Sequence, residues 1–117
     1  MRWTQIDERC VDDVVILDLR VPDLTQTDAT SQLVEKTRQL VSNGRTRIVL
    51  NLCDLPYIDS DGLGQIVSAH KAAREAAGSV SVCGLTPRLR RAFQVNRLDS
   101  FLAVFDSERE AVQSFGA

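Results

Sequence analysis

The sequence predicts an α/β domain built on a mixed, mostly parallel sheet of about five strands with about four helices. Two observations support this fold class. Short apolar runs rich in β-branched residues alternate with segments of helical spacing, and the first two apolar runs follow each other directly. The alternation predicts parallel strands with right-handed crossovers, and the initial pair adds an antiparallel edge. From a length of 117 residues, we expect one domain that spans 1–117.

The first half of the chain contains three predicted strands and one predicted helix. The run VVILDL is almost continuously apolar, as expected for a strand that is covered on both faces. Asp12 and Asp13 are the expected hairpin turn, although they lack the glycine that marks the strongest turn signal. The expected elements are strands over 3–9 and 13–20, a loop over 20–30, a helix from Thr27 or Asp28 to Ser42 that Asn43 and Gly44 end, and a central strand over 47–53.

The second half of the chain alternates helices with strands. A long helix is predicted over 63–77, ended by Gly78, with an apolar stripe formed by Leu63, Ile66, Val67, His70, Ala73 and Ala77. The remaining expected elements are a strand over 79–85, a helix capped by Thr86 with Pro87 at its first position, a turn over 96–99, a strand over 101–106, and a final helix that begins at Ser107 in the Ser-x-x-Glu capping pattern.

Composition and charge exclude several classes of function. The net charge is −2, and no Lys/Arg run points to nucleic acid or to an anionic membrane surface. The first nine residues lack the apolar core of a signal peptide, and no apolar run approaches the roughly 20 residues that a membrane helix needs. We therefore expect a cytoplasmic protein without direct membrane insertion.

The cysteines and the single histidine do not form a recognisable metal pattern. Cys10, Cys53 and Cys83 are odd in number and lack a Cys-x-x-Cys spacing, so we interpret them as small buried hydrophobic residues in a reducing compartment. His70 falls on an apolar helix stripe and is interpreted as a packing residue. No metal and no cofactor are expected.

Residues 55–64, LPYIDSDGLG, are the stretch with the most distinctive chemistry. They join the strand 47–53 to the following helix, and they place Asp59, Ser60 and Asp61 directly before Gly62. Loops at the carboxyl ends of parallel strands form the functional rim of such a sheet. A helix start there offers unpaired backbone N–H groups and the positive end of the helix dipole. Ser60 is therefore a candidate nucleophile, phosphate acceptor or helix cap.

A catalytic role for Ser60 is not supported, and we do not expect an enzyme. A nucleophilic serine needs a base, and the only histidine, His70, lies about 15 Å away along the helix axis. The Gly-x-Ser-x-Gly and phosphate-loop patterns are absent, and Asp59 and Asp61 would repel a phosphate. Three later arginines could bind an acidic partner or a nucleotide phosphate: Arg88, Arg90 and Arg91. They could equally form the solvent-exposed face of a helix.

Phosphorylation and helix capping both remain open for Ser60. A phosphate would add about −1.5 to −2 charges beside two carboxylates, and a partner surface laid against this helix start would be expelled without a change of fold. Alternatively, Ser60 or Asp59 caps the helix and Asp61 complements the dipole in its first turn. The two roles are compatible with each other.

Residues 51–67, NLCDLPYIDSDGLGQIV, strongly resemble the signature of STAS domains, in particular of bacterial anti-sigma-factor antagonists. Residues 82–112 resemble the C-terminal half of the same family, with a Thr-Pro-capped helix, a leucine before the last strand and a Ser-x-x-Glu-Ala final helix. The resemblance covers nearly the whole chain and implies a compact STAS fold with a mixed sheet.

The resemblance also implies a function. Ser60 matches the family's serine that an anti-sigma factor, an ATP-dependent serine kinase of ATPase fold, phosphorylates. The unphosphorylated form binds that factor and frees the sigma factor for transcription; the phosphorylated form is released and a phosphatase resets it. The implied partner-binding residues are Asp23, Thr25, Asp59, Ser60, Asp61, Gly62, Leu63 and Gly64.

Two departures from the family pattern support an alternative function. Asp61 stands where the family has a second serine, and in the preceding loop Pro22 and Thr25 replace a glycine and an aspartate. STAS domains also serve as unphosphorylated subunits of larger signalling or lipid-transport complexes. A permanent charge at Asp61 would suit such a fixed role.

Overall fold

The computed structural model describes residues 5–20, 27–55, 58 and 60–115. Its five-stranded sheet has the order β1-β2-β3-β4-β5. In chain order the elements are β1 (Gln5–Val11), β2 (Val14–Arg20), α1 (Thr27–Ser42), β3 (Arg47–Asn51), α2 (Ser60–Glu75), β4 (Ser79–Cys83), α3 (Pro87–Val95), the 3-10 helix η1 (Leu98–Ser100), β5 (Ala103–Phe105) and α4 (Glu108–Gln113). The predicted α/β class, with five strands and four α-helices, is confirmed.

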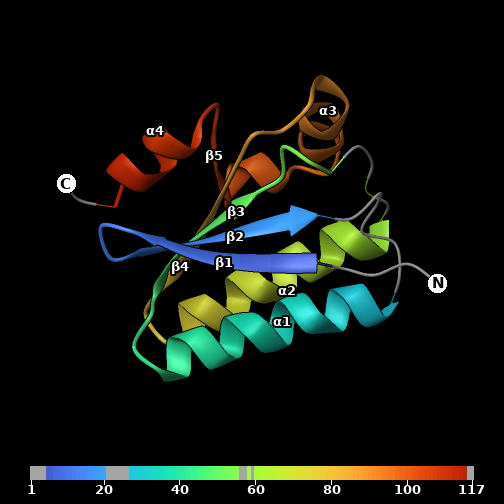
Figure 1. The fold of residues 1–117 in the computed structure, drawn as a ribbon. Coiled ribbons are helices and arrows are strands. Elements are labelled where there is room, and N and C mark those ends of the chain that lie inside the picture. The colour runs from blue at the N-terminus through green and yellow to red at the C-terminus, as the bar shows by residue number, and fades with distance from the viewer. Residues whose placement is uncertain (1–4, 21–26, 56–57, 59, 116–117) are drawn as a thin grey trace.

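The sheet is mixed in the predicted way (Figure 1). β1 pairs antiparallel with β2, whereas β2, β3, β4 and β5 are parallel neighbours. The register aligns Asp18, Asn51 and Cys83 across three adjacent strands. These residues lie at or near the carboxyl ends of their strands, so the segments that follow β3 and β4 leave the sheet at the same rim.

The β1–β2 hairpin closes through two residues in the left-handed region. Asp12 has φ 48° and Asp13 has φ 70°. Positive φ at both central residues is the type I′ arrangement, whose twist matches that of the strands. Aspartate tolerates this conformation better than most side chains do, which explains how the predicted turn forms without glycine.

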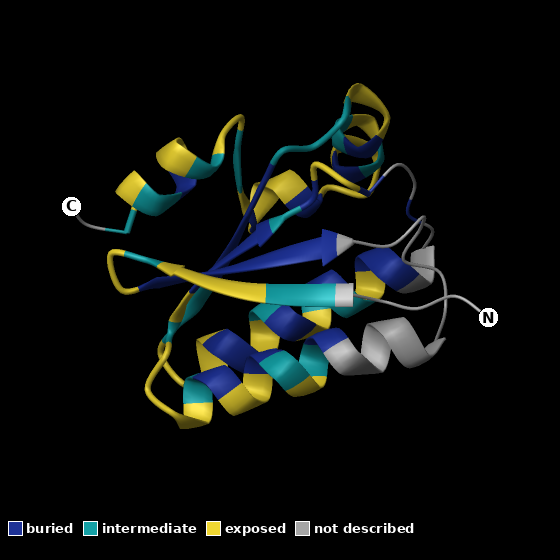
Figure 2. Cartoon of the chain, viewed as in Figure 1, coloured by how far each residue is buried: buried dark blue, intermediate teal, exposed yellow. Residues whose placement is uncertain are grey.

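Two hydrophobic clusters hold the layers together. Helices α1 and α2 lie side by side on one face of the sheet, and α4 covers part of the other (Figures 1 and 2). The larger cluster includes Leu33 of α1, Ile66 of α2 and Phe93 of α3, all buried against strand residues. The smaller cluster packs Ala111 of α4 onto Ile16 and neighbouring strand residues. Burial on both faces explains the continuous apolar run of β2.

The end of α2 differs from its prediction. The apolar stripe predicted for this helix includes Ala77, but Ala77 is exposed and left-handed, with φ 60°, beyond the last helical residue. Gly78 donates its N–H to the Ala73 carbonyl at 2.8 Å, which completes a Schellman ending. A Cβ on Gly78 would lie 2.5 Å from the Thr46 carbonyl oxygen. Close approach, rather than positive φ, therefore requires glycine at position 78.

The structure also shortens three predicted strands. β3 ends at Asn51, β4 ends at Cys83, and β5 contains only Ala103–Phe105. Phe101 precedes β5 because its N–H, like that of Leu102, bonds to the Leu98 carbonyl in the turn around η1. The two predicted helix caps are confirmed, since the Thr86 and Ser107 hydroxyls accept backbone N–H groups at 3.2 Å.

Candidate functional site

The sequence-predicted site lies at the start of α2, on the carboxyl rim of the sheet. Ser60 is the first residue of α2, and its backbone directly follows the segment that leaves β3. Leu55, Ile58 and Leu63 flank this start, and all three are buried in the larger hydrophobic cluster. These contacts fix the direction in which α2 leaves the rim.

The structure brings part of the predicted site together. Ser60, Asp61, Gly62, Leu63 and Gly64 form the first turn of α2 and the residue that follows it. Gly62 and Leu63 are buried, whereas Gly64 is exposed. The other predicted partner-binding residues, Asp23, Thr25 and Asp59, lie outside the described residues, so their proximity to Ser60 stays a prediction.

A charged network next to this rim was missed by the sequence analysis. Asp18, two residues before the end of β2, is only 5% exposed. Arg9 of β1 donates to both of its carboxylate oxygens, from Nε at 2.6 Å and from Nη2 at 2.9 Å. Asn51 of β3 donates from Nδ2 to Oδ1 at 2.7 Å. A lone aspartate within an apolar strand was the available signal, because a buried carboxylate needs such partners.

The network continues at both ends. Arg9 Nη2 also donates to Glu108 Oε1 at 2.6 Å, which ties the first residue of α4 to β1. Hydrogen bonds to Asp18 and then to Glu108 raise the pKa of Arg9 well above its usual value. At the other end, Asn51 Oδ1 accepts the N–H of Cys53 at 3.2 Å. The network therefore links α4, across three strands, to the segment that leads to Ser60.

Gly84, in the turn between β4 and α3, packs against the Asn51 end of this network. It has φ 73°, and a Cβ there would lie 2.9 Å from Asn51 Oδ1 and 3.1 Å from Cys53 Cβ. The turn after β4 therefore packs directly on the turn after β3. This contact leaves no space for a side chain at position 84.

His70 lies on the buried side of α2 as a packing residue. Its ring centroid is 5.7 Å from that of Phe101, and its Nδ1 is buried without a hydrogen-bond partner among the described residues. Burial, and then the charge of Arg74, lower its pKa. A neutral ring packed in this way fits the packing interpretation better than a catalytic one.

The described residues also bear on metal binding and on membrane insertion. Within these ranges, no group of three or more His, Cys, Asp or Glu side chains is arranged to hold a metal ion. None of the helices in the described part of the chain is both long and apolar enough to cross a membrane.

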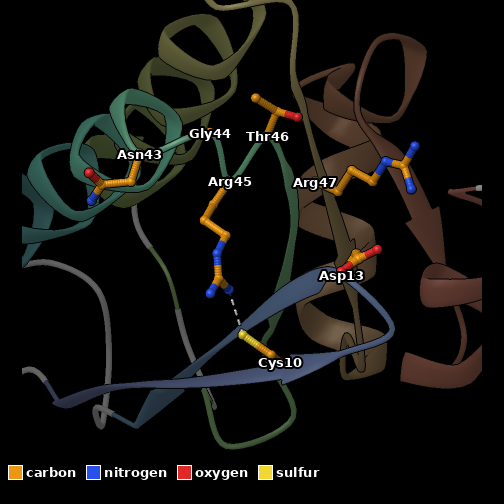
Figure 3. A pocket seen from close by; sticks show the side chains of 7 residues that line it. All are labelled: Cys10, Asp13, Asn43, Gly44, Arg45, Thr46 and Arg47. Carbon is orange, nitrogen blue, oxygen red and sulfur yellow. Dashed lines mark hydrogen bonds between the residues drawn. The ribbon is translucent and has the colours of Figure 1, made fainter.

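A polar cavity of about 550 Å³ lies at the opposite rim, between the hairpin and the end of α1 (Figure 3). Arg45 Nη1 donates to the Cys10 sulfur there at 2.8 Å. Arg47 extends away from Cys10, so the two guanidinium groups do not converge on one point (Figure 3). The cavity therefore offers no focused anion site.

The prediction of three buried cysteines is wrong for two of them. Cys10 and Cys53 are exposed, and only Cys83 is buried. Cys10 lies on the edge strand β1, and Cys53 lies beyond the end of β3, where the side chain of Asn51 takes over its backbone hydrogen bond. The interpretation of all three cysteines as small buried hydrophobic residues therefore holds for Cys83 alone.

This arrangement predicts the order of thiol modification. We expect iodoacetamide at pH 8 to label Cys10 and Cys53 in the folded protein and to leave Cys83 unmodified, because burial raises the pKa of Cys83 to about 11. Peptide mass spectrometry, with a denatured sample as the control, measures the labelling. Labelling of native Cys83 at the rate of Cys53 would contradict the burial described here.

Comparison with known proteins identifies the family of this fold. The model of the STAS domain family matches residues 5–111. A Bordetella bronchiseptica protein, provisionally named the anti-sigma factor antagonist BtrV, is 32% identical over 84 residues, which are 72% of each chain.

Solved structures agree with this assignment at the level of the fold. A Thermotoga maritima protein, provisionally described as an anti-sigma factor antagonist, matches with TM-score 0.80 and 24% identity over 93% of this chain and 92% of its own. Unphosphorylated SpoIIAA, an anti-sigma factor antagonist, matches with TM-score 0.73 and 23% identity over 97% and 100% of the two chains. The phosphorylated form of SpoIIAA from Bacillus matches with TM-score 0.71 and 23% identity over 95% and 99%. With the family match covering most of its length, the chain belongs to the STAS domain family.

Proposed function

We propose that this protein is an anti-sigma-factor antagonist that binds a cognate anti-sigma factor and is released when Ser60 is phosphorylated. The observation that carries the proposal is the start of α2. There an exposed glycine, Gly64, follows a serine and an acidic residue at a helix start that buried neighbours hold in place. A rigid and closely approachable helix start suits a partner surface.

No described part of the fold requires glycine at position 64. Gly64 lies inside α2, and a Cβ built on it meets no heavy atom of the described residues within 4 Å. Glycine in a helix interior is about 1 kcal/mol less favourable than alanine. A glycine at this helix position, where no described neighbour requires one, fits close approach by another molecule.

Charge explains how phosphorylation would act. Phosphoserine carries about −1.5 to −2 charges at pH 7. The positive end of the helix dipole would stabilise that charge, by about 1 kcal/mol at most, so the fold itself would tolerate the modification. A partner that buries this helix start would lose affinity, because the added charge would be desolvated beside Asp59 and Asp61.

The comparisons support the class of function proposed, that of an anti-sigma-factor antagonist. The relative from Bordetella bronchiseptica is provisionally named an anti-sigma factor antagonist, and SpoIIAA has been solved in unphosphorylated and phosphorylated forms. By extension we propose an anti-sigma factor that is a serine kinase of ATPase fold, a phosphatase that acts on phospho-Ser60, and action in the cytoplasm as one non-enzymatic module. The partner surface would comprise the first turn of α2 and Gly64, together with Asp23, Thr25 and Asp59.

Replacement of Ser60 with glutamate tests the switch. We expect affinity capture from the native lysate with wild-type bait to retain a small ATPase-fold kinase, identified by mass spectrometry. Calorimetry with that purified kinase should then show affinity for Ser60→Glu reduced roughly tenfold or more. The matched control is Ser60→Ala, which removes the hydroxyl without adding charge and should retain binding. Equal affinity of the wild type and Ser60→Glu would contradict the switch.

Replacement of Gly64 with alanine separates stability from binding. We expect the free energy of unfolding to rise by about 0.5–1 kcal/mol, because alanine favours the helix and the added methyl meets open space. Affinity for the captured kinase should fall, because the same methyl obstructs close approach. Urea unfolding and calorimetry measure the two effects. Higher stability with undiminished affinity would place the partner surface away from Gly64.

A fixed structural role is the second candidate function, and Asp61 favours it. A carboxylate next to Ser60 gives the helix start a permanent charge, so a partner adapted to it would respond less to a phosphate. In that case wild-type and Ser60→Glu baits would retain the same multi-subunit signalling or lipid-transport complex, and Ser60 would carry no phosphate under any growth condition.

A further inference from the structure

A second surface, remote from Ser60 in the sequence, combines positive charge with exposed apolar side chains. It is formed by Arg91 and Val95 of α3, by Arg97 between α3 and η1, and by Phe101 directly after η1. All four residues are exposed, and α3 packs against η1. We call these four residues the α3–η1 surface.

Residues 87–101, which include this surface, carry a net positive charge, whereas the remaining chain carries a net negative charge. Residues 87–101 contain four arginines and one aspartate, whereas the other residues contain ten basic and fifteen acidic side chains. Arg90 pairs with Asp106 at 2.6 Å. In the ranges that the structure describes, Arg91 and Arg97 make no ion pair. Their charges are therefore available to another molecule.

The arginines of α3 are placed against the helix dipole. α3 begins at Pro87, has no acidic residue in its first turn, and carries Arg88, Arg90 and Arg91 in its first five positions. Positive charge near a helix N-terminus is unfavourable by about 0.3–1 kcal/mol per residue. The stability of α3 alone does not explain this choice of residues.

The backbone conformation of Arg97 is a second feature that lowers stability. It has φ 57° and ψ 27°, the left-handed conformation that glycine adopts freely. A side chain there costs roughly 1–2 kcal/mol. Strained residues of this kind concentrate at functional sites, and here the strained residue supplies an exposed cation.

Apolar exposure is the third unfavourable feature of the same segment. Val95 is 72% exposed and Phe101 is 47% exposed, and these are the exposed large hydrophobic residues of the described part of the chain. Arg91 and Val95 are four residues apart on α3, so they share one helix face. Leu89 and Phe93 occupy the buried face. The outer face of α3 thus offers a cation next to an apolar contact.

We propose that the α3–η1 surface binds an acidic, amphipathic segment of a partner protein. Arg91 and Arg97 would pair with its carboxylates, while Val95 and Phe101 would contact its apolar side chains. Charge complementarity selects an acidic occupant, and the exposed valine and phenylalanine favour a protein over a nucleic acid backbone. The site goes beyond the Ser60 switch and does not depend on it.

An NMR titration tests this proposal on the intact chain. The probe is a short amphipathic peptide with glutamates along one side and leucines along the other. We expect the amide signals of residues 88–101 to shift, and binding to weaken as salt is added. Replacing Arg91 with glutamate should reduce affinity at least tenfold. Arg38→Glu, an equal charge change on an exposed residue of α1, is the matched control and should leave binding close to wild type.

Replacing Arg97 with glycine distinguishes a binding role from a structural one. Arg97→Gly should raise the melting temperature and yet weaken peptide binding, because it removes both strain and a cation. Ala77→Gly is the matched control, since Ala77 has φ 60° and is exposed. It should raise the melting temperature and leave binding unchanged.

Several results would overturn the proposal. Shifts of amide signals spread over the whole protein, or equal loss of binding in Arg91→Glu and Arg38→Glu, would show that net charge, and not the α3–η1 surface, attracts the peptide. Tighter binding of a DNA duplex than of the peptide, mapped to the same residues, would assign the surface to nucleic acid. Concentration-dependent self-association that Arg91→Glu abolishes would assign it to a second copy of this chain.

Discussion

Replacing Arg9 with methionine should lower the free energy of unfolding by about 2–4 kcal/mol. The change leaves the carboxylate of Asp18, which is 5% exposed, without its guanidinium partner. Removing one partner of a fully buried ion pair costs about 3–5 kcal/mol, and this range is lowered because the Arg9 side chain is 43% exposed and partly screened by solvent. Urea unfolding monitored by circular dichroism measures the loss. Methionine keeps much of the aliphatic contact of arginine.

Arg90→Met is the matched control for this prediction. Arg90 pairs with Asp106, whose side chain is 82% exposed. Exposed pairs of this kind contribute less than about 1 kcal/mol. A second substitution, Asp18→Asn in the Arg9→Met background, should recover part of the stability, because Asn51 can still donate to the remaining amide oxygen. Equal losses in Arg9→Met and Arg90→Met would show that Asp18 does not require its partner.

The network around Asp18 shows where prediction from sequence ends. Its members lie at positions 9, 18, 51 and 108, and only the register of β1, β2 and β3, with the placement of α4, brings them together. Residues so far apart in sequence carry no periodic pattern that joins them. By contrast, strand alternation, helix stripes and caps are local features, which explains why the elements themselves were predicted well.

The ends of elements were predicted less well than their cores, for reasons specific to each residue. Ala77 fits the apolar period of α2, but the Schellman ending places it outside the helix. Gly78 resembles an ordinary helix stop, whereas the nearby Thr46 carbonyl is what excludes a side chain there. Both effects depend on which segment lies opposite, and a single sequence does not reveal that.

For the candidate site, the sequence predicted the strand-to-helix junction and its position on the carboxyl rim. The start of α2 at Ser60 agrees with that prediction, although the helix was expected from Leu63. The sequence did not predict that Asn51 holds the N–H of Cys53 and rests against Gly84. Asn51 was part of the motif that carried the family resemblance, but its contacts became visible only with the structure.

Replacing Gly84 with alanine should affect both stability and partner binding. The added Cβ would take a left-handed conformation and would lie 2.9 Å from Asn51 Oδ1 and 3.2 Å from the Cys53 nitrogen. Backbone strain of about 1–2 kcal/mol and overpacking of about 1–3 kcal/mol combine to a loss of about 2–5 kcal/mol. Because Asn51 and Cys53 begin the segment that leads to Ser60, affinity for the captured anti-sigma factor should also fall, even far below the melting temperature.

Gly44→Ala isolates the backbone part of that effect. Gly44 has φ 82°, and a Cβ there meets no heavy atom of the part of the chain that the structure describes within 4 Å, so its replacement should cost only the strain of about 1–2 kcal/mol. It also lies at the rim opposite Ser60 and should leave partner affinity unchanged. If Gly84→Ala lost no more stability or affinity than Gly44→Ala, the contact with Asn51 would not position the segment before Ser60. A larger loss of both would establish that the two turns at the carboxyl rim act as one support for the start of α2.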